Sequence, residues 1–334
     1  MSAMTKRRVT LDDLAARCGV SPATVSRALS DRPGVRPDLR ARVREAAQSL
    51  GYALPSKLKG QRVTLVASEA AMADYARNQF TLHVLEGLRA RAEARGLELE
   101  IRTAAVPFEA TFAAARDTAG YLLLSPETDA QIEALAALGV PAVIINSDDP
   151  MMRLSSVAPC NRTAAALATD RLIALAHRDI LFLTRPGRRT IARRREGWAE
   201  RMRAEGLCAD NSRVIEVSDW LPALAAEAVA ARVAAGRDFT AILAAGDSLA
   251  TGALLGLARA GVDVPGEVSV MGFDGLPQCD LQSPPLSALE IPMQAIGALA
   301  LDLLSDTLSM PDLPPRRVEL ACRIVERGST GPRA

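Results

Sequence analysis

The sequence predicts two folds in one chain: a small all-α headpiece at the N-terminus and a larger α/β core made of two doubly wound parallel-sheet lobes. Three observations point to this. Helix-start signals are dense in the first fifty residues, apolar runs alternate with alanine-rich segments after residue 63, and the two parts carry opposite charge. The 334 residues are also many for a single core. We place the headpiece at 1–52, a linker at 53–62 and the core at 63–334.

The headpiece has two helix starts close together. Thr10-Leu11-Asp12-Asp13 has the pattern of a capping box, and Ser21-Pro22 places a capping serine before a proline at the first helical position. Gly19 supplies the turn between these helices, and a third helix runs from Pro37 to a cap at Gly51. A small core is expected from apolar residues at helical spacing: Val9, Leu14, Ala15, Cys18, Val20, Val25 and Leu29. This arrangement is typical of the helix-turn-helix, whose second helix enters the DNA major groove.

Charge is divided unevenly along the chain. Residues 1–62 hold 13 basic and 5 acidic residues, whereas the remainder holds 27 and 34, although the whole chain has a net charge of only +1. A basic excess on the helix-turn-helix end favours attraction to DNA phosphate there. A merely solvated charged face is the alternative interpretation.

Composition argues against a metal site and a membrane segment. The five cysteines (Cys18, Cys160, Cys208, Cys279 and Cys322) are scattered, and only two histidines are present, so no zinc site of familiar spacing is expected. The chain opens with polar and basic residues, and no apolar stretch approaches 18 residues. We expect no cofactor, no contact with a membrane and a reduced, cytoplasmic setting.

Eight short apolar runs predict the strands of the core. They cover 63–67, 97–101, 120–124, 140–145, 180–183, 214–217, 241–244 and 268–271. Helical segments are expected near 79–95, 129–138, 162–177, 190–205, 223–235 and 247–260. Nearly continuous apolar strands separated by helices are typical of parallel sheets covered on both faces. Eight strands are many for one sheet, so two lobes are expected.

Several motifs occur in an order that resembles the lactose-repressor (LacI/GalR) family of bacterial transcription regulators. The segment from Val9-Thr10-Leu11 to Leu50-Gly51-Tyr52 is the strongest match. The later motifs are Asn78-Gln79-Phe80, Arg193-Arg194-Arg195-Glu196-Gly197-Trp198, Gly272-Phe273-Asp274 and Arg327-Gly328-Ser329-Thr330. Together they cover almost the whole chain.

The resemblance implies a DNA-binding headpiece joined to a periplasmic-binding-protein-like core. In such a core the chain crosses three times between an N-lobe, here about 63–158 and 292–314, and a C-lobe, about 161–289 and 316–330. A small metabolite, by default a sugar or sugar derivative, binds in the cleft and controls affinity for operator DNA. A homodimer, possibly assembled into a tetramer, is implied because one headpiece reads only half of a near-palindromic operator on double-stranded DNA. The expected function is that of a repressor.

The same resemblance suggests which headpiece residues meet DNA. Pro22, Ala23 and Arg27 occupy the specificity positions, and Arg27 is suited to a guanine edge, with a plain phosphate contact as the alternative. Phosphate contacts are expected from Thr10, Ser21, Thr24 and Ser26. The linker departs from the family pattern because it is about one helical turn short. Leu58 is our candidate for the minor-groove wedge, and an ordinary linker residue is the alternative.

Candidate effector-binding residues are carried over in the same way: Asn78, Phe80, Asn146, Arg188, Thr190, Arg194 and Asp274. Asn146 and Asp274 are polar groups at strand ends, where doubly wound sheets bind ligands. The asparagines could instead cap helices or turns, and Phe80 could belong to the core. Two departures from the family, Gly246 and the Cys160-Asn161 pair, weaken the inference of a sugar and leave a carboxylate held by Arg194 open.

Two other functions compete with this interpretation. Gly246-Asp247-Ser248-Leu249 spells the motif of GDSL-type serine hydrolases. Those enzymes need a histidine base late in the chain, and both His83 and His177 lie upstream of the motif. A ligand-binding protein without a DNA role would share the core but would lack the helix-turn-helix. We therefore expect a regulator and not an enzyme.

Overall fold

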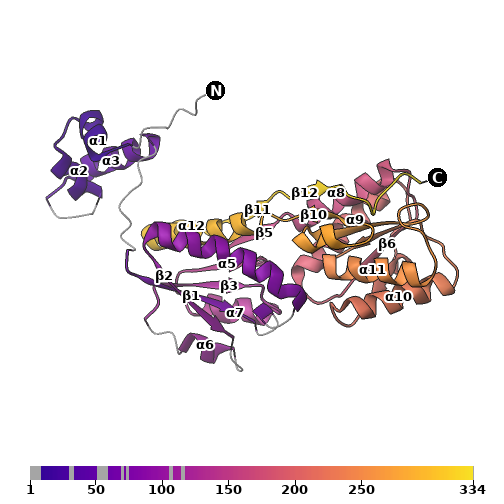
Figure 1. Ribbon diagram of the computed structural model, residues 1–334. Coiled ribbons are helices and arrows are strands. Elements are labelled where there is room, and N and C mark those ends of the chain that lie inside the picture. Colours follow the sequence, from indigo (N-terminus) through magenta and orange to yellow (C-terminus); the bar gives the residue numbers. More distant parts are fainter. Residues whose placement is uncertain are drawn as a thin grey trace. The chain divides into compact units, whose positions relative to one another are not determined.

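The computed structural model describes residues 9–29, 34–50, 59–68, 71–72, 75–104, 108–113 and 117–333. The chain divides into two compact units, Met1–Lys59 and Gly60–Ala334, which are drawn in Figure 1. Each unit has a core of its own, and they are described in turn.

The first unit is a three-helix module: α1 (Leu11–Cys18), α2 (Pro22–Leu29) and α3 (Pro37–Leu50). The predicted capping box is present, since the Thr10 hydroxyl accepts from the Asp13 amide and the Asp13 carboxylate accepts from the Thr10 amide. Gly19 ends α1 in the left-handed conformation, with φ of 67°. The buried cluster comprises Leu14, Ala15, Cys18, Val25, Ala28, Leu29, Val43, Ala46 and Ala47. Gly51 lies outside the described residues.

The second unit contains two six-stranded sheets. The first has the order β11-β5-β4-β3-β1-β2, and every neighbouring pair in it is parallel. Its strands are β1 (Arg62–Ala67), β2 (Glu98–Thr103), β3 (Gly120–Leu124), β4 (Ala142–Ile145), β5 (Ser155–Pro159) and β11 (Arg317–Leu320). The second has the order β12-β10-β9-β8-β6-β7, with only β10 and β12 antiparallel. Its strands are β6 (Ile180–Thr184), β7 (Val214–Glu216), β8 (Ala241–Ala244), β9 (Ser269–Asp274), β10 (Ser287–Glu290) and β12 (Arg323–Val325).

Helices cover both faces of each sheet, as Figure 1 shows. Around the first sheet lie α5 (Tyr75–Arg95), α6 (Glu109–Ala113), α7 (Asp129–Ala137) and α12 (Met293–Ser309). Around the second lie α8 (Asn161–Ala174), α9 (Arg189–Ala204), α10 (Pro222–Ala234) and α11 (Asp247–Arg259), with short 3₁₀ helices η1 (Asn211–Arg213) and η2 (Pro277–Leu281). The fold class predicted from the sequence is confirmed. The predicted strand and helix lists omit β5, β10, β11, β12, α6 and α12.

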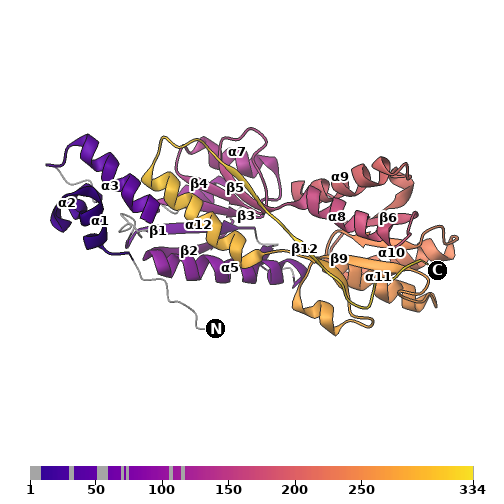
Figure 2. The same ribbon diagram turned by 90° about the horizontal axis from the view of Figure 1, so that it is seen from above.

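The chain passes between the lobes at three places: around Cys160 after β5, at 291–292 after β10, and at 321–322 between β11 and β12. We call these three segments the hinge; Figure 2 shows the last of them as a yellow strand of chain running from one lobe to the other. One predicted boundary is wrong. The C-lobe was expected to resume at 316, but β11 pairs in parallel with β5 of the first sheet. Residues 317–320 are a short edge strand of mixed polarity, so their pattern does not indicate which sheet they join.

No helix among the described residues is both long enough and apolar enough to cross a bilayer.

Candidate functional site

The exposed side of α2 carries four of the eight predicted DNA-contacting residues. Pro22, Ala23, Ser26 and Arg27 are exposed, whereas Val25, Ala28 and Leu29 are buried in the headpiece core. This division follows from helical periodicity, because positions three and four apart share a face. The exposed face therefore presents one cation, one hydroxyl and two small apolar side chains.

Ser21 and Thr24 are engaged with each other at the start of α2. The Thr24 amide donates to the Ser21 hydroxyl oxygen at 3.2 Å, and the two hydroxyl oxygens are 2.9 Å apart. Ser21 thus caps the helix as expected. Thr10 does the same for α1, where its hydroxyl donates to Asp13 at 2.8 Å. The DNA contacts of these residues stay predictions, and Leu58 lies outside the described residues.

The core has a cavity between its two lobes, and it brings together six of the predicted effector residues. They are Phe80, Asn146, Arg188, Thr190, Arg194 and Asp274. Ala71, Thr81, Ser125, Trp220, Gly246 and Ser248 complete the lining of this inner cavity, whose volume is about 40 Å³. Asn78 lies on α5, but its side chain is outside the described part of the structure. The binding roles of these residues stay predictions.

Polar groups reach the inner cavity because parallel strands end at its edge. Ser125 follows β3, Asn146 follows β4, and Asp274 ends β9. All three have positive φ, at 49°, 59° and 122° respectively. Non-glycine residues seldom adopt such backbone angles, and those that do cluster at ligand sites. The Asn146 amide nitrogen donates to the Ser125 hydroxyl at 3.0 Å, which fixes the amide across the strand ends.

Arg194 is the most constrained charge in the inner cavity. It is 5% exposed, and its guanidinium carbon lies 3.6 Å from the centroid of the Phe273 ring. Its Nε donates to Asn161 Oδ1 at 2.8 Å, and its Nη1 donates to the Ala245 carbonyl at 2.6 Å and to Asp274 Oδ1 at 3.3 Å. A buried charge is tolerated only when paired and hydrogen-bonded, as it is here.

Two carboxyl groups next to this arginine have raised pKa values. Burial raises the pKa of Asp274, opposed by the neighbouring Arg194 and Arg188. Burial, reinforced by the charge of Asp274, raises the pKa of Asp247 to about 8. Asp247 Oδ2 accepts from the Leu276 amide at 2.8 Å and from the Cys279 thiol at 3.2 Å. Only one of the two carboxyls therefore needs to carry a negative charge near neutral pH.

Trp220 is the main cavity residue that the sequence interpretation missed. It lies in the loop between β7 and α10, is 5% exposed, and its indole nitrogen has no hydrogen-bond partner among the described residues. The Arg188 guanidinium carbon lies 5.4 Å from its ring centroid. One signal was available, since Trp220 follows an apolar run and is one of only two tryptophans in the chain. A buried tryptophan N–H usually has a hydrogen-bond partner, so this one is available to a polar ligand in the cavity.

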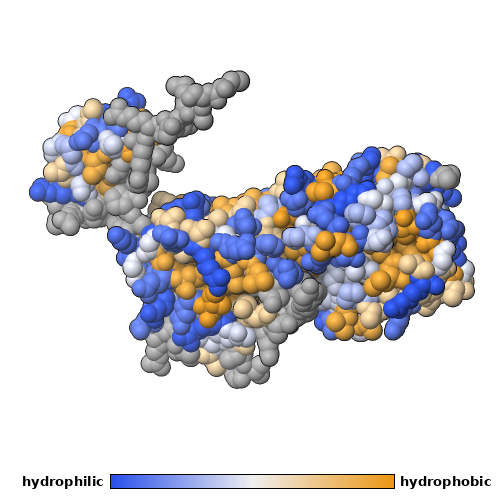
Figure 3. Space-filling model, viewed as in Figure 1, coloured by the Kyte–Doolittle hydropathy of each residue, from blue (hydrophilic) through white to orange (hydrophobic). Residues whose placement is uncertain are grey.

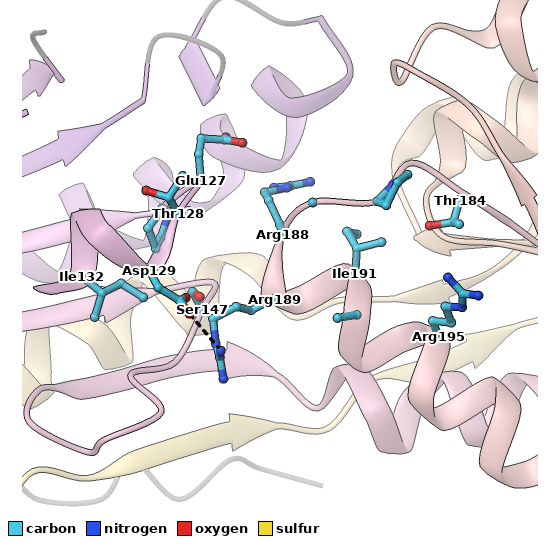
Figure 4. Close-up of a pocket in the computed structure, with 14 residues that line it drawn as sticks. Glu127, Thr128, Asp129, Ile132, Ser147, Thr184, Arg188, Arg189, Ile191 and Arg195 are labelled. Atoms are coloured by element: carbon cyan, nitrogen blue, oxygen red, sulfur yellow. Dashed lines mark ion pairs between the residues drawn. The ribbon is translucent and has the colours of Figure 1, made fainter.

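A larger outer chamber adjoins the inner cavity. Its volume is about 480 Å³, and Arg188 lines both spaces. Figure 4 shows Glu127, Thr128 and Asp129 of the first lobe facing Arg188 and Arg189 of the second. The Thr184 hydroxyl also lines the chamber, is buried, and has no hydrogen-bond partner among the described residues.

Ion pairs join the lobes beside this chamber. Asp148, which follows β4, lies 3.3 Å from Arg189 and 3.4 Å from Arg193, both on α9. Asp129 lies 3.5 Å from Arg189, the contact drawn as a dashed line in Figure 4. Arg193 is not among the effector-binding residues predicted from the sequence. One sequence cannot show that a carboxylate of the other lobe reaches it.

Two residues of the hydrolase motif, Gly246 and Ser248, line the inner cavity. The Ser248 hydroxyl donates to the Trp220 carbonyl. Both histidines lie in the described part of the chain: His177 is hydrogen-bonded with Thr240 and Ser269, and His83 with Glu86. The described residues therefore place neither histidine as a base for Ser248. No group of three potential metal ligands occurs within the described ranges.

Comparison with known proteins agrees with this architecture. Residues 10–54 match the family model of bacterial regulatory proteins, lacI family, and residues 169–330 match a periplasmic binding protein-like domain. The chain is 31% identical over 330 residues to the HTH-type transcriptional regulator MalR of Streptomyces coelicolor, covering 96% of each chain. It is 30% identical to the regulator reg1 of Streptomyces lividans, with the same coverage of each.

Solved structures share the fold over the same extent. A complex of the transcriptional regulator CelR with cellobiose has a TM-score of 0.74 at 27% identity, and the match covers 96% of this chain and all of that one. The lac repressor dimer bound to operator and an anti-inducer has a TM-score of 0.72 at 22% identity, with 97% and 100% coverage. The full-length identity to MalR and the match of the headpiece model show the family. The chain therefore belongs to the lacI family of bacterial regulatory proteins and is a DNA-binding transcriptional regulator controlled by a small effector.

Proposed function

We propose that the effector is an uncharged, polyhydroxylated molecule, a sugar or sugar derivative, bound in the inner cavity. One observation carries this. A buried acceptor, Asn146 Oδ1, and a buried donor, Trp220 Nε1, line the same cavity, and neither has a partner in the part of the chain that the structure describes. Buried polar atoms left unpaired are costly, so they favour a ligand that supplies both a donor and an acceptor. A hydroxyl group supplies both.

The charges of the inner cavity favour a neutral sugar over a carboxylate. Arg194 is already paired with Asp274 and donates to two uncharged oxygens. A ligand carboxylate would have to displace Asp274 or lie beside it, and like charges in a buried site repel strongly. Two hydroxyls can accept from Arg194 and donate to Asp274 without disturbing the pair. The cellobiose in the CelR complex is a neutral sugar of this kind.

A thermal-shift screen tests this proposal. We expect neutral mono- and disaccharides to raise the melting temperature and the corresponding sugar acids to leave it unchanged. Asn146→Ala removes the free acceptor and should abolish the shift, whereas Leu138→Ala, at an exposed site outside the lining, is the matched control. Stabilisation by acids and not by neutral sugars would contradict the proposal.

The inner cavity is too small for a sugar in the form described. About 40 Å³ holds a few water molecules, whereas ligand pockets usually enclose several hundred cubic ångströms. Binding therefore requires the lobes to move apart, which breaks or rearranges the Asp148 ion pairs with Arg189 and Arg193. This couples effector binding to lobe position, and by linkage DNA must change effector affinity by the same factor.

We propose that the headpiece residues contact DNA in the roles predicted from the sequence, and that the headpiece, linker and core span 1–52, 53–62 and 63–334. The exposed face of α2 supports the residue roles. Arg27 would read a base, and the capped N-terminus of α2 would face a phosphate. As an operator-binding protein it would act in the cytoplasm and repress transcription. Titration of an upstream DNA fragment with and without a stabilising sugar tests this, and release by the sugar is the expected result.

We propose a homodimer formed through the second lobe. Leu221, Leu255 and Leu281 are exposed by 55%, 45% and 84%, on or beside α10, α11 and η2, and Figure 3 shows apolar surface over α10 and α11. A twofold operator calls for a second copy of the chain as the partner. Light scattering should give the mass of a dimer for the native chain. The double variant that combines Leu255→Glu and Leu281→Glu should have the mass of a monomer. A native monomer would refute the dimer, and a tetramer would require a further interface.

A further inference from the structure

Two cysteines that are far apart in the sequence meet at the hinge. Cys160 follows β5 and is the N-cap of α8, and Cys322 lies between β11 and β12. Strands β5 and β11 are parallel neighbours in the first sheet, whereas α8 and β12 belong to the second lobe. Each cysteine therefore stands where the chain leaves one lobe for the other, and the last crossing is visible in Figure 2.

The local geometry suits a covalent link. The Cys160 amide donates to the Leu320 carbonyl at 2.9 Å, which extends the β5–β11 ladder to the edge of the hinge. Pro159 and Leu320 are the last paired residues of these strands, so Cys160 lies one residue beyond the ladder and Cys322 lies two residues beyond it. The side chains of Cys160 and Cys322 are hydrogen-bonded to each other, and neither cysteine is in a disulfide. Cys160 is partly exposed, whereas Cys322 is buried, so a solute reaches Cys160 first.

The two thiols differ in reactivity. The hydrogen bond from Cys322 lowers the pKa of Cys160 to about 6, and the same bond raises the pKa of Cys322. Cys160 also occupies the N-cap position of α8, and a helix N-terminus favours a thiolate. Cys279 provides the contrast, because burial and the neighbouring Asp247 raise the pKa of its thiol. The structure therefore pairs one nucleophilic thiolate with one protonated partner.

We propose that Cys160 and Cys322 are a redox site that closes to a disulfide across the hinge when the protein meets a peroxide. The Cys160 thiolate attacks a peroxide oxygen, the O–O bond breaks, and a sulfenic acid forms as hydroxide leaves and is protonated. The Cys322 thiol then attacks the sulfenic sulfur, the S–S bond forms, and water leaves. Two thiols are oxidised and hydrogen peroxide is reduced to two waters.

The disulfide would act on the effector site as well as on the hinge. Asn161, the residue after Cys160, accepts the hydrogen bond from Arg194 Nε at 2.8 Å. A bond between two of the three hinge segments restricts the movement that the inner cavity needs to admit a ligand. This regulatory consequence rests on the proposed function, whereas the disulfide itself does not.

Peptide mapping of the full-length protein after hydrogen peroxide treatment tests the disulfide. We expect one peptide pair joining Cys160 to Cys322, separated again by dithiothreitol. Cys208→Ser, at an exposed cysteine, is the matched control and keeps the cross-link, whereas Cys160→Ser and Cys322→Ala lose it. In Cys322→Ala the sulfenic acid on Cys160 should be trapped by dimedone, which shows that Cys160 still reacts, and a native thermal melt shows that the variant is folded. Free thiols at both Cys160 and Cys322, at a peroxide dose that oxidises Cys208, would overturn the proposal.

Binding to a DNA fragment from the gene's own upstream region tests the consequence. The oxidised native chain should differ at least about fivefold in affinity from the reduced chain, which is the lower end of allosteric coupling. Oxidised Cys160→Ser should not differ. A complete cross-link with unchanged affinity would overturn the regulatory role. If the reduced chain binds this fragment no better than scrambled DNA, the proposed function fails, and the peptide map still decides the disulfide.

Discussion

The exposed face of α2, which we propose contacts DNA, and the inner cavity of the core hold their side chains in opposite environments. Arg27 is exposed on α2, and its neighbours on the face come from the same eight-residue helix. Arg194 is 5% exposed and contacts Asn161, Ala245 and Asp274, which lie on other elements. Arg27 is exposed on one short helix, whereas Arg194 is held in a packed core by residues from several elements.

On the exposed face of α2, binding and stability therefore depend on different residues. In the inner cavity, the same residues contribute to both. An exposed side chain that contacts only its ligand can be replaced with little change in the free energy of unfolding. A buried charged group cannot, because its removal leaves partners unpaired in a medium of low polarity. Substitutions on the exposed face of α2 should therefore change specificity with little effect on folding. Substitutions in the inner cavity should alter binding and folding together.

The largest effect is expected for Arg194→Ala. It leaves Asp274 and the Asn161 and Ala245 oxygens without their donor, so the free energy of unfolding of the core should fall by about 3–5 kcal/mol. Urea denaturation followed by circular dichroism measures this.

Arg195→Ala is the matched control for that change. Arg195 is the next residue on α9 and makes an exposed ion pair with Glu216 at 2.9 Å, so its loss should cost less than about 1 kcal/mol. Equal losses in the two variants would mean that burial does not distinguish the inner cavity from the surface.

Asp247→Asn should change how stability depends on pH. The pKa of Asp247 is raised from 3.8 to about 8 in the folded chain, so the folded state holds a proton that the unfolded state releases. The contribution of Asp247 to the free energy of unfolding is therefore fully present at low pH. It is lost as the pH rises from about 4 to 8, by up to about 1.4 kcal/mol per pH unit. The asparagine variant should show a flatter profile in denaturation between pH 5 and 7. A profile parallel to that of the native chain would show that Asp247 is ionised in the folded state.

The two regions also differ in how far the sequence predicts them. The caps at Thr10 and Ser21, the turn at Gly19 and the exposed position of Arg27 follow from local patterns, and all are present. The inner cavity needed the family resemblance, and even so Trp220 and the Asp148 ion pairs were missed, because they depend on which loops meet across the cleft. β5 and β11 were missed for a related reason. Ser155–Pro159 and Arg317–Leu320 are short and contain polar residues, and they become strands by pairing within the sheet, β5 with β4 and β11 with β5.

Arg27→Ala should weaken specific DNA binding and leave folding unchanged. Loss of a contact with a guanine edge costs about 1–3 kcal/mol, or roughly 5- to 150-fold in affinity, and relaxes preference at one base pair. Anisotropy titration of the upstream fragment and of a scrambled duplex measures both effects, and thermal melting should be unaltered. An equal loss on both duplexes would assign Arg27 to phosphate instead of a base.

The smallest effect is expected for loss of the N-cap of α1, which stabilises the headpiece locally. Thr10→Ala removes the hydroxyl that accepts from the Asp13 amide, and loss of such a cap costs about 1 kcal/mol. Hydrogen exchange of the α1 amides in the full-length chain should quicken about fivefold, while exchange in β8 and β9 stays unchanged because those strands belong to the other unit. Thr10→Ser keeps the hydroxyl and should exchange like the native chain. Quickened exchange in β8 or β9 would show that the headpiece and the core do not fold as separate units.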